Sequence, residues 1–406
     1  AIFSSVLQYF NFFVAFSLAP LFYNLGIIIG LLFFFPKMGL SGLAWGVVLG
    51  AGMHLSIQIP PLWKMGFSPR LLIDFRSAAL RKIFKLMTPR VLGSAAYQLN
   101  LIVLTALAST IAVGSIKIFN LSNNLYGVPA SLIGIPFAAV IFPILSQHAA
   151  AGHEDKFLSA LSPILRKIIL CAAPISCLMF ILRAQIIRIL YGTQLTVSGY
   201  FGWQETRLTA ASLGVFALSI FAACLIPLLA RAFYALHDTK TPVKIALWSV
   251  GLNLFLSWSL IKLLTSQPIV ANFFAWVFKL KGVDNLSILA LPLALSLATI
   301  IQFFWLSSSL QRKINIAGQP LFNRFFVVKI LLACLAMSLS AYIFLRIGAT
   351  FLIVNTVLGI SLQALLSALF SGAIYLATCW LLGLREPIIL GKEFLIFLKK
   401  KFYGKK

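Results

Sequence analysis

Long apolar stretches without a charged side chain recur along this sequence, and they restrict the chain to one kind of fold. A helix rises 1.5 Å per residue, so about 20 apolar residues cross the roughly 30 Å hydrocarbon layer of a membrane. Lipid offers the backbone no hydrogen-bond partners, and a helix satisfies its own. The sequence therefore predicts an all-α integral membrane protein, a polytopic helical bundle with ten full spans at 17–36, 41–62, 91–112, 126–147, 168–182, 208–230, 245–261, 286–309, 330–345 and 350–384.

The chain begins inside a further apolar run. Residues 1–13 are typical of the end of a span, and no charged leader or cleavage site precedes them. We therefore interpret the sequence as an N-terminally truncated fragment of a longer protein, with one partial span before the ten full ones.

Charged residues are few, and most of them are basic. Only 10% of the residues are charged, against about a quarter in soluble proteins, and the formal net charge is +25. If successive loops alternate between the two sides of the membrane, 24 of the 33 Lys and Arg residues lie on one side and 9 on the other. This asymmetry places the loop 63–90 and the tail 385–406 in the cytoplasm, where their cations attract anionic lipids. It favours a multi-pass plasma membrane protein with a cytoplasmic C-terminus over a nucleic-acid-binding protein.

Two connections between spans have the character of membrane-surface segments. The cytoplasmic loop 63–90 contains an amphipathic piece, 75–87, which we expect to lie along the membrane. On the opposite side, the segment 264–285 contains an aromatic patch typical of the membrane–water interface. The patch consists of Phe273, Phe274, Trp276 and Phe278.

Polar side chains recur at helical spacing on four of the predicted spans. On the span 91–112 they fall within about 60° of one another, and Arg90 extends them at the cytoplasmic end. Polar groups facing lipid are costly, so we expect these stripes to line a hydrated cavity, although interhelical hydrogen bonds use the same residue types. The stripes are Ser94, Gln98, Thr105 and Ser109; Ser249, Asn253 and Ser257; Thr299, Gln302 and Ser309; and His54 with Gln58.

The span 126–147 contains a regular pattern of helix-bending residues. Pro129, Pro136 and Pro143 recur every seven residues, and Gly127 and Gly134 do so on the opposite side. Proline frees backbone carbonyls, and glycine lets a neighbouring helix come close. The pattern predicts a helix that bends between conformations, with a static kinked helix as the alternative.

No motif for metal, nucleotide or acid–base chemistry is present. All eight carboxylates lie in loops, which argues against a proton antiporter with a buried acid and against an intramembrane acid–base enzyme. Phosphate-binding loops, metalloprotease motifs and nucleophile elbows are absent. The five cysteines lie within spans and lack metal-binding spacing, so we expect them to be packing residues. The sequence thus predicts a transporter without ATP chemistry, cofactor or metal.

Four segments, in order along the chain, resemble those of MurJ-type lipid II flippases of the multidrug/oligosaccharidyl-lipid/polysaccharide exporter superfamily. They are GLAWGVVLGAGMHLSIQIPPLWKMGF, TPRVLGSAAYQLNLIVLTALAST, GSIKIFNLSNNLYGVPASLIGIPFAAVIFPILSQHAAAG and LLARAFYALHDTKTPVKIA. The resemblance implies a two-lobed exporter fold. Its parts would be the end of the first lobe at 1–62, an inter-lobe linker at 63–90, a second six-helix lobe at 91–309, an extra C-terminal helix pair with its linker at 310–384, and a basic tail at 385–406.

The resemblance also implies a function. The protein would flip lipid II, the undecaprenyl-linked peptidoglycan precursor, from the cytoplasmic to the outer leaflet by alternating access, using an ion gradient or the membrane potential. The pyrophosphate needs a wet cationic path, while the polyprenyl tail stays in lipid beside the run 350–384. Cell-wall synthesis enzymes are expected partners. The alternatives are a related exporter of another oligosaccharide-lipid or a drug, a membrane glycosyltransferase, and an inactive cell-wall scaffold.

The candidate site residues combine the polar stripes with positions matched to the family. Many members have Asp-Arg in a loop before the eighth span and a Glu three residues after the Arg; here Asn123, Asn124 and Gly127 occupy these positions, so the triplet is neutral. Helix geometry points Asn100 away from the stripe on its own span. The predicted substrate cavity comprises Arg90, Ser94, Gln98, Asn100, Thr105, Asn123, Asn124 and Asn253, and the predicted gate or lobe-packing residues are Pro129, Gly134, Pro136, Asp238 and Lys240.

Overall fold

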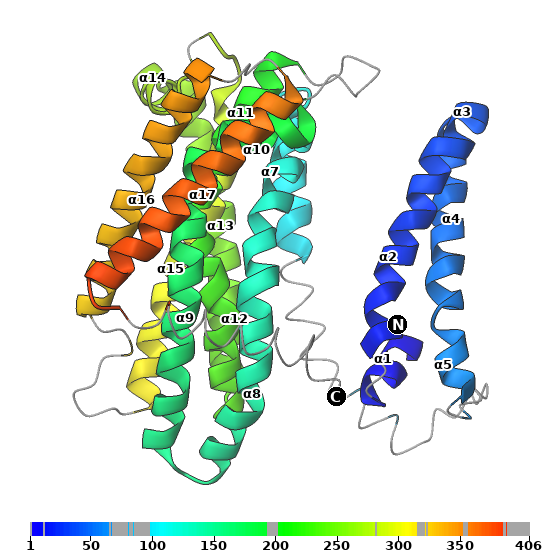
Figure 1. Cartoon of the computed structure of the whole chain (residues 1–406), viewed down its shortest axis with the longest axis vertical. Coiled ribbons are helices and arrows are strands. Elements are labelled where there is room, and N and C mark those ends of the chain that lie inside the picture. The colour runs from blue at the N-terminus through cyan, green and yellow to red at the C-terminus, as the bar shows by residue number, and fades with distance from the viewer. Residues whose placement is uncertain are drawn as a thin grey trace. The chain divides into compact units, whose positions relative to one another are not determined.

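The chain forms two compact helical units, residues 1–85 and 86–406 (Figure 1). This computed structural model describes residues 2–10, 13–64, 66, 80, 84, 98–192, 202–280, 282–314, 321, 324–351, 356–384 and 387. Within these ranges all regular secondary structure is helical. The boundary between the units falls in the segment 63–90, most of which lies outside the described residues, including all of the amphipathic piece 75–87 except Leu80 and Phe84.

Eight helices in the described part of the chain are long and apolar enough to cross a membrane. A bent pair, α11 (Trp203–Ala217) and α12 (Ile220–Ala235), adds a ninth span if the two count as one. The helix Gln98–Ile111 is apolar but shorter, and the rest of the predicted span 91–112 lies outside the described residues. The multi-span helical membrane fold is therefore confirmed, whereas the count of ten spans stays a prediction.

The first unit is a helical hairpin with short helices at its ends. Close backbone contacts hold it together, because glycines from both arms face one another. A Cβ atom on Gly26 would lie 2.3 Å from Cα of Gly50, and one on Gly30 would lie 2.3 Å from Cα of Gly46. Small residues four apart are the usual means by which membrane helices approach this closely. The helices are α1 (Ile2–Tyr9), α2 (Phe13–Ile29), η1 (Gly30–Phe34), α3 (Phe35–Met38), α4 (Leu40–Ser56) and α5 (Ile59–Lys64).

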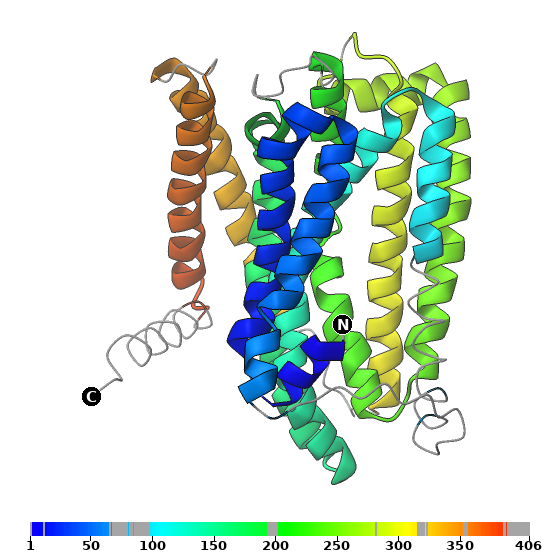
Figure 2. The same ribbon diagram turned by 90° about the vertical axis from the view of Figure 1, so that its right-hand side faces the viewer.

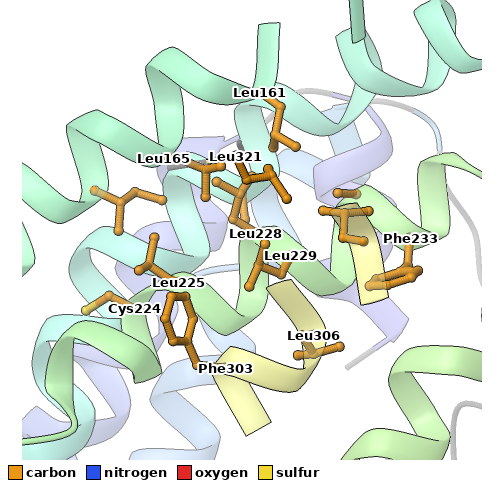
Figure 3. Packing of buried hydrophobic residues seen from close by; sticks show 14 of the residues in the cluster. Leu161, Leu165, Cys224, Leu225, Leu228, Leu229, Phe233, Phe303, Leu306 and Leu321 are labelled. Atoms are coloured by element: carbon orange, nitrogen blue, oxygen red, sulfur yellow. The ribbon is translucent and has the colours of Figure 1, made fainter. Parts of the chain in front are cut away.

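The second unit is a larger helix bundle. Its main core lies where α8, α9, α12 and α15 meet, and Figure 3 shows leucines and phenylalanines from α9, α12 and α15 interdigitating there. Besides α11 and α12, its helices are Gln98–Ile111, α7 (Ser115–Pro129), η2 (Ala130–Gly134), α8 (Ile135–Ala150), α9 (Glu154–Ile181), α10 (Arg183–Tyr191), α13 (Lys240–Ser266), α14 (Pro268–Val277), η3 (Leu286–Leu289), α15 (Ala290–Lys313), α16 (Arg324–Phe351) and α17 (Val357–Leu381).

The predicted span 208–230 is broken into α11 and α12, which meet at an angle of 46°. Two buried serines satisfy polar groups at the break. Ser219 Oγ donates to Ser296 Oγ of α15 at 3.1 Å, and Ser296 Oγ donates to the carbonyl of Val215 at 3.3 Å. A break inside an apolar layer is tolerated because neighbouring side chains bond the freed backbone groups.

The final helix pair, α16 and α17, packs against α9 at one side of the second unit (Figure 2). The sequence pattern suggested spans at 330–345 and 350–384. Instead α16 continues to Phe351, and α17 begins at Val357 after a short connection. The long apolar run is therefore the end of one helix followed by a second, because apolar content alone does not mark where a helix turns back.

A buried polar face on α17 joins the final pair together. Gln363 Nε2 donates to the carbonyl of Leu345 at 2.8 Å, and Ser367 Oγ donates to the carbonyl of Ala341 at 2.9 Å. Ser371 continues this face one turn further on and is fully buried. In an apolar medium such bonds between a side chain and the backbone of a neighbouring helix contribute to helix association.

Candidate functional site

A buried hydrogen bond in the second unit joins two predicted cavity residues. Asn253 Nδ2 of α13 donates to Asn100 Oδ1 of the helix Gln98–Ile111 at 2.8 Å. Both side chains are buried, at 1% and 3% exposure. As helix geometry predicts, Asn100 and Gln98 lie on different faces of their helix: Gln98 is exposed, whereas Asn100 is buried. This contact is an interhelical hydrogen bond, which the sequence left open as the alternative to a polar stripe that lines a cavity.

Two polar atoms on α13 are left without a hydrogen bond within the described part of the chain, one of them in the side chain of Asn253 itself. Asn253 Oδ1 and, one turn on, Ser257 Oγ are buried without a hydrogen-bond partner among the described residues. One turn earlier, Ser249 Oγ donates to the carbonyl of Ala298 in α15 at 3.2 Å. The stripe on α13 therefore faces the interior of the unit, and its buried polar groups are uncharged.

The other stripe residues bond mainly within their own helices. Thr105 Oγ1 donates to the carbonyl of Leu101 at 2.8 Å, and Thr299 Oγ1 donates to that of Leu295 at 2.7 Å. Ser109 donates to the carbonyl of Ala106 at 2.6 Å on the exposed side of its helix. Bonds of this kind let a hydroxyl sit in an apolar layer without any partner on another helix. Arg90 and Ser94 lie outside the described residues.

The polar pair in the first unit belongs to a small network. Gln58 Nε2 lies 3.2 Å from His54 Nδ1, and Ser4 Oγ of α1 donates to Gln58 Oε1 at 3.1 Å. The Tyr23 ring of α2 meets the imidazole edge-on, with 6.5 Å between ring centres. The network joins α1, α2 and α4 and contains no carboxylate among the described residues.

The expected loop that carries Asn123 and Asn124 is part of a helix. α7 begins at Ser115, after Gly114 with φ +88°, and runs through both amides. Asn123 is half-buried and Asn124 is exposed. The inner face of α7 is instead apolar, since Phe119 and Tyr126 pack against Phe216 of α11 at 6.1 and 4.8 Å between ring centres. The expectation that Asn123 and Asn124 lie in a loop before the span was wrong, because a polar segment without a helix-breaking residue extends the helix.

The bending residues surround a π-helical turn, Ala130–Gly134, between α7 and α8. The extra residue in this turn brings Pro129 and Gly134, five positions apart, to the buried side, whereas Gly127 and Pro136 are exposed. A Cβ atom on Gly134 would lie 2.5 Å from the Cys224 carbonyl oxygen of α12. The prolines therefore do not share one face of the helix, and neither do the two glycines. The prediction assumed an unbroken α-helix, whereas the π-helical turn shifts the faces after residue 129.

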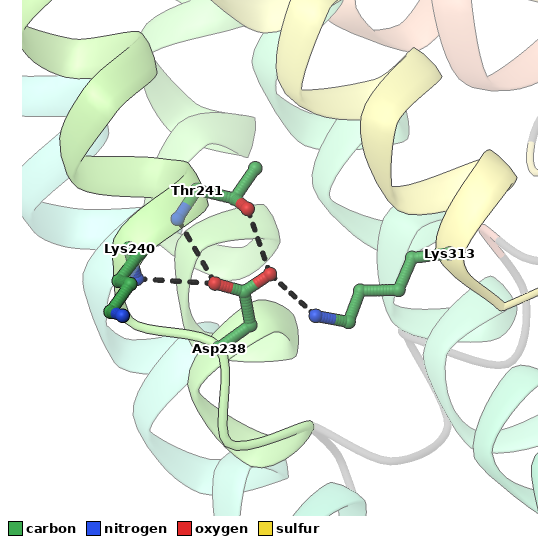
Figure 4. A network of polar contacts seen from close by, with 4 residues as sticks. All are labelled: Asp238, Lys240, Thr241 and Lys313. Carbon is green, nitrogen blue, oxygen red and sulfur yellow. Dashed lines mark hydrogen bonds and ion pairs between the residues drawn. The ribbon is translucent and has the colours of Figure 1, made fainter.

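Asp238 lies between α12 and α13 and caps the start of α13 (Figure 4). Its Oδ1 accepts the backbone N–H groups of Lys240 and Thr241 at 3.1 and 3.0 Å, and its Oδ2 accepts the Thr241 hydroxyl at 2.8 Å. Oδ2 also forms an ion pair with Lys313 at the end of α15. The carboxylate thus links two neighbouring helices of the second unit, and Lys240 contributes its backbone N–H to this network.

These partners determine the charge of Asp238. Burial alone would raise the pKa of this carboxyl, but the Lys313 ammonium and the Thr241 donors lower it to about 2. The group is therefore ionised at physiological pH, and the ion pair with Lys313 is present there.

Sequence reasoning missed one partly buried cation, Arg183 at the start of α10. Its Nη1 donates to the carbonyl of Phe180 at 2.7 Å, and its guanidinium lies over the rings of Phe180 and Phe278, 4.9 and 5.4 Å from their centres. Its stem passes Gly214 of α11, where a Cβ atom would lie 2.7 Å from Arg183 Cδ. No spacing rule in the sequence brings together groups from α9, α11 and the segment after α14.

No group of three or more His, Cys, Asp or Glu side chains that could hold a metal ion occurs among the described residues. The five cysteines carry free thiols, and three of them are buried. Apolar spans with uncharged polar groups buried between them define a polytopic helical membrane protein.

The comparisons with known proteins identify the family. A family profile described as "Lipid II flippase MurJ" matches residues 1–363, so the chain belongs to the lipid II flippase MurJ family. This is a family of transporters rather than enzymes.

The chain is similar to curated relatives along most of its length. It is 26% identical over 385 residues to a probable lipid II flippase MurJ of Buchnera aphidicola subsp. Acyrthosiphon pisum, covering 94% of this chain and 70% of the relative. A probable lipid II flippase MurJ of Haemophilus influenzae is 30% identical over 258 residues, covering 62% of this chain and 50% of the relative. A solved structure titled "Lipid II flippase MurJ, inward closed conformation" matches 92% of this chain and 70% of its own with a TM-score of 0.63 at 22% identity, which supports the fold.

Proposed function

We propose that this chain moves lipid II from the cytoplasmic to the outer leaflet of the plasma membrane. The observation that carries the proposal is the family match over residues 1–363. The helical units suit this task, since a polar headgroup needs an interior path and the lipid tail needs an apolar surface.

In this proposal transport occurs by alternating access. The π-helical turn at Ala130–Gly134 supplies a place where the α7–α8 helix bends, with Pro129, Gly134 and Pro136 around it. The Asp238–Lys313 ion pair ties the start of α13 to the end of α15, so these two helices move as one body. Lys240 lies at the same helix start and belongs to the same proposed gate.

The proposed headgroup path runs along the neutral polar groups of the second unit. Asn253 lies deepest among the described candidates, and Asn124 is exposed on α7. Because a pyrophosphate needs cationic partners, we assign that role to Arg90. The other proposed lining residues are Ser94, Gln98, Asn100, Thr105 and Asn123. The polyprenyl tail would lie along α16 and α17, whose outer faces expose leucines such as Leu335 and Leu369.

The proposal also covers the lipids and enzymes around the protein and the source of energy for transport. The cytoplasmic C-terminal tail would contact anionic lipids, and cell-wall synthesis enzymes would use the flipped product. No cofactor is needed, because an ion gradient or the membrane potential would supply the energy.

Depletion and complementation test the proposed function. Cells depleted of the protein should accumulate lipid II on the cytoplasmic side, and the gene on a plasmid should restore its appearance on the outer side. Restoration of growth without restored lipid II translocation would indicate an exporter of another lipid-linked sugar or a scaffold. No restoration at all would contradict the proposal.

A further inference from the structure

Three exposed aromatic rings in the second unit each have a cation over them, from the residue four positions further along the same helix. This spacing brings two side chains to one face of a helix. The pairs are Trp203 with Arg207 in α11 at 4.3 Å, Trp258 with Lys262 in α13 at 5.5 Å, and Tyr342 with Arg346 in α16 at 5.3 Å, each measured from the charged group to the ring centre.

All three pairs lie in the half of the unit that is farther from the Asp238–Lys313 ion pair. α11 begins at this end, and α13 and α16 finish there, next to α14 (Figure 1). Alternation of the loops places this end on the non-cytoplasmic side, which has only 9 of the 33 Lys and Arg residues. The pairs therefore use three of the few cations on that side.

The rings face outward rather than into the bundle. Trp203, Trp258 and Tyr342 are 64%, 58% and 48% exposed. An amphipathic ring with this exposure is favourable at the boundary between lipid tails and headgroups, where one edge stays apolar and the other is wet. The exposure of the three rings suits the interfacial layer of a membrane.

The three cations have no carboxylate partner among the described residues. Lys262 and Arg346 are exposed and Arg207 is partly exposed. Arg346 donates from Nε and Nη2 to the Tyr342 hydroxyl at 3.1 and 2.8 Å, which leaves further N–H donors on the guanidinium. An anion in the interfacial layer would complete each pair, and phospholipid phosphates are the anions of that layer.

α14 extends the same surface between α13 and α15. Trp276 and Phe273 are 70% and 57% exposed, whereas Phe274 packs inward against the core beneath it. The aromatic patch expected from the sequence is thus divided, with two rings facing outward and the others anchoring the helix. No residue of α14 is buried, as suits a helix lying in the interface.

The opposite end of the unit lacks this arrangement. Trp248 and Trp380 are 69% and 66% exposed, yet among the described residues neither has a cation over its ring. Lys244 is four residues before Trp248, so proximity in sequence does not by itself produce the contact. Arg166 lies over the ring of Phe326 at this opposite end, 5.7 Å from the ring centre, but that ring is buried. Among the described residues of the second unit, exposed rings paired with a cation four positions further along the same helix therefore occur at one end only.

We propose that these three aromatic–cation pairs are binding sites for the phosphate groups of phospholipids in the non-cytoplasmic leaflet. Each ring lies at the level of the glycerol backbone, and each cation holds one headgroup phosphate. Together with α14 they anchor the second unit in that leaflet, independently of any transported substrate.

Native mass spectrometry of the purified chain, titrated with phosphatidylglycerol and separately with lipid II, tests the proposal. Arg207→Gln, Lys262→Gln and Arg346→Gln should each weaken the binding of one lipid about fivefold, the contribution of one cation near an anionic surface. Trp258→Leu should weaken the same lipid as Lys262→Gln, and the double variant should bind like either single one, because ring and cation act together. Lys262→Arg should keep the site.

Lys37→Gln is the matched control. It removes an exposed cation that loop alternation places on the same side of the membrane but that has no ring contact, and it should leave lipid binding unchanged. Equal binding by the wild type and all three Gln variants would overturn the proposal. So would an effect confined to lipid II, since that would make the pairs a substrate site, and so would an equal loss in Lys37→Gln, which would indicate unspecific charge attraction.

Discussion

The hydroxyl of Tyr375 in α17 donates a 2.9 Å hydrogen bond to the carbonyl of Leu170 in α9. Four residues after Leu170 stands Pro174, which has no N–H, so this carbonyl lacks its donor within the helix. The Tyr375 side chain of the final helix pair therefore supplies the hydrogen bond that α9 cannot supply to its own carbonyl. This contact, together with the buried cluster around Met337 and Cys334, attaches the pair to the second unit.

Removing this hydroxyl should destabilise the protein. Tyr375→Phe leaves a buried carbonyl without a partner, which costs about 1–3 kcal/mol of unfolding free energy. In Pro174→Ala the restored N–H satisfies the carbonyl, so adding Tyr375→Phe to that background should cost much less. Thermal unfolding in detergent measures both effects, and an equal cost of Tyr375→Phe in the two backgrounds would contradict the explanation.

The glycine contacts of the first unit should tolerate no added methyl group. A Cβ atom on Gly46 would lie 2.7 Å from Cα of Gly30, so Gly46→Ala must separate α4 from α2 and η1, at a cost of about 1–3 kcal/mol. Gly52→Ala, on the same helix with nothing within 4 Å, is the control and should be neutral or stabilising. Thermal unfolding or protease protection of the variants should separate them, and similar stability would show that the helices are not in contact there.

Lowering the pH should weaken the Asp238 hydrogen-bond network only below about pH 4. The pKa of this carboxyl is lowered from 3.8 to about 2. A lowered pKa means that its stabilisation is complete above about pH 4 and is lost as the pH falls towards 2. The difference in melting temperature between the wild type and Asp238→Asn should therefore shrink over that range. Lys240→Gln keeps the backbone donor and should melt like the wild type at every pH.

The buried asparagine pair should show strong coupling. Asn253→Leu or Asn100→Leu alone leaves the other amide unsatisfied, which costs about 1–3 kcal/mol, whereas the double Leu variant should cost less than the sum. Unfolding in detergent measures the cycle. Additive effects would mean that the 2.8 Å contact contributes nothing to stability.

The exposed amide of α7 distinguishes a transport path from a plain helix surface. We expect Asn124→Arg to support lipid II transport, because the family resemblance implies an Arg at the matched position, and Asn124→Leu to impair it. Complementation of depleted cells provides the measurement. Normal transport by the Leu variant would show that the side chain has no part in the path.

Much of the fold follows from patterns along the chain. Where the structure describes them, the predicted apolar stretches are largely helical, and the family resemblance drawn from four segments is confirmed by the match over residues 1–363. The placement of the candidate residues follows far less well. Asn100 faces inward, Asn123 and Asn124 lie on a helix, and Asp238 is bound to a lysine 75 residues away.

The physical reason is how far apart in the sequence the residues lie that decide each feature. Crossing a bilayer depends on the apolar content of about 20 consecutive residues, so the sequence alone determined that this is a multi-span helical protein. Which face of a helix is buried, where a helix breaks, and which partner fills a vacant carbonyl depend on residues from distant segments. Only the tertiary structure decided that Asn253 meets Asn100 and that Tyr375 completes the hydrogen bonding left open by Pro174.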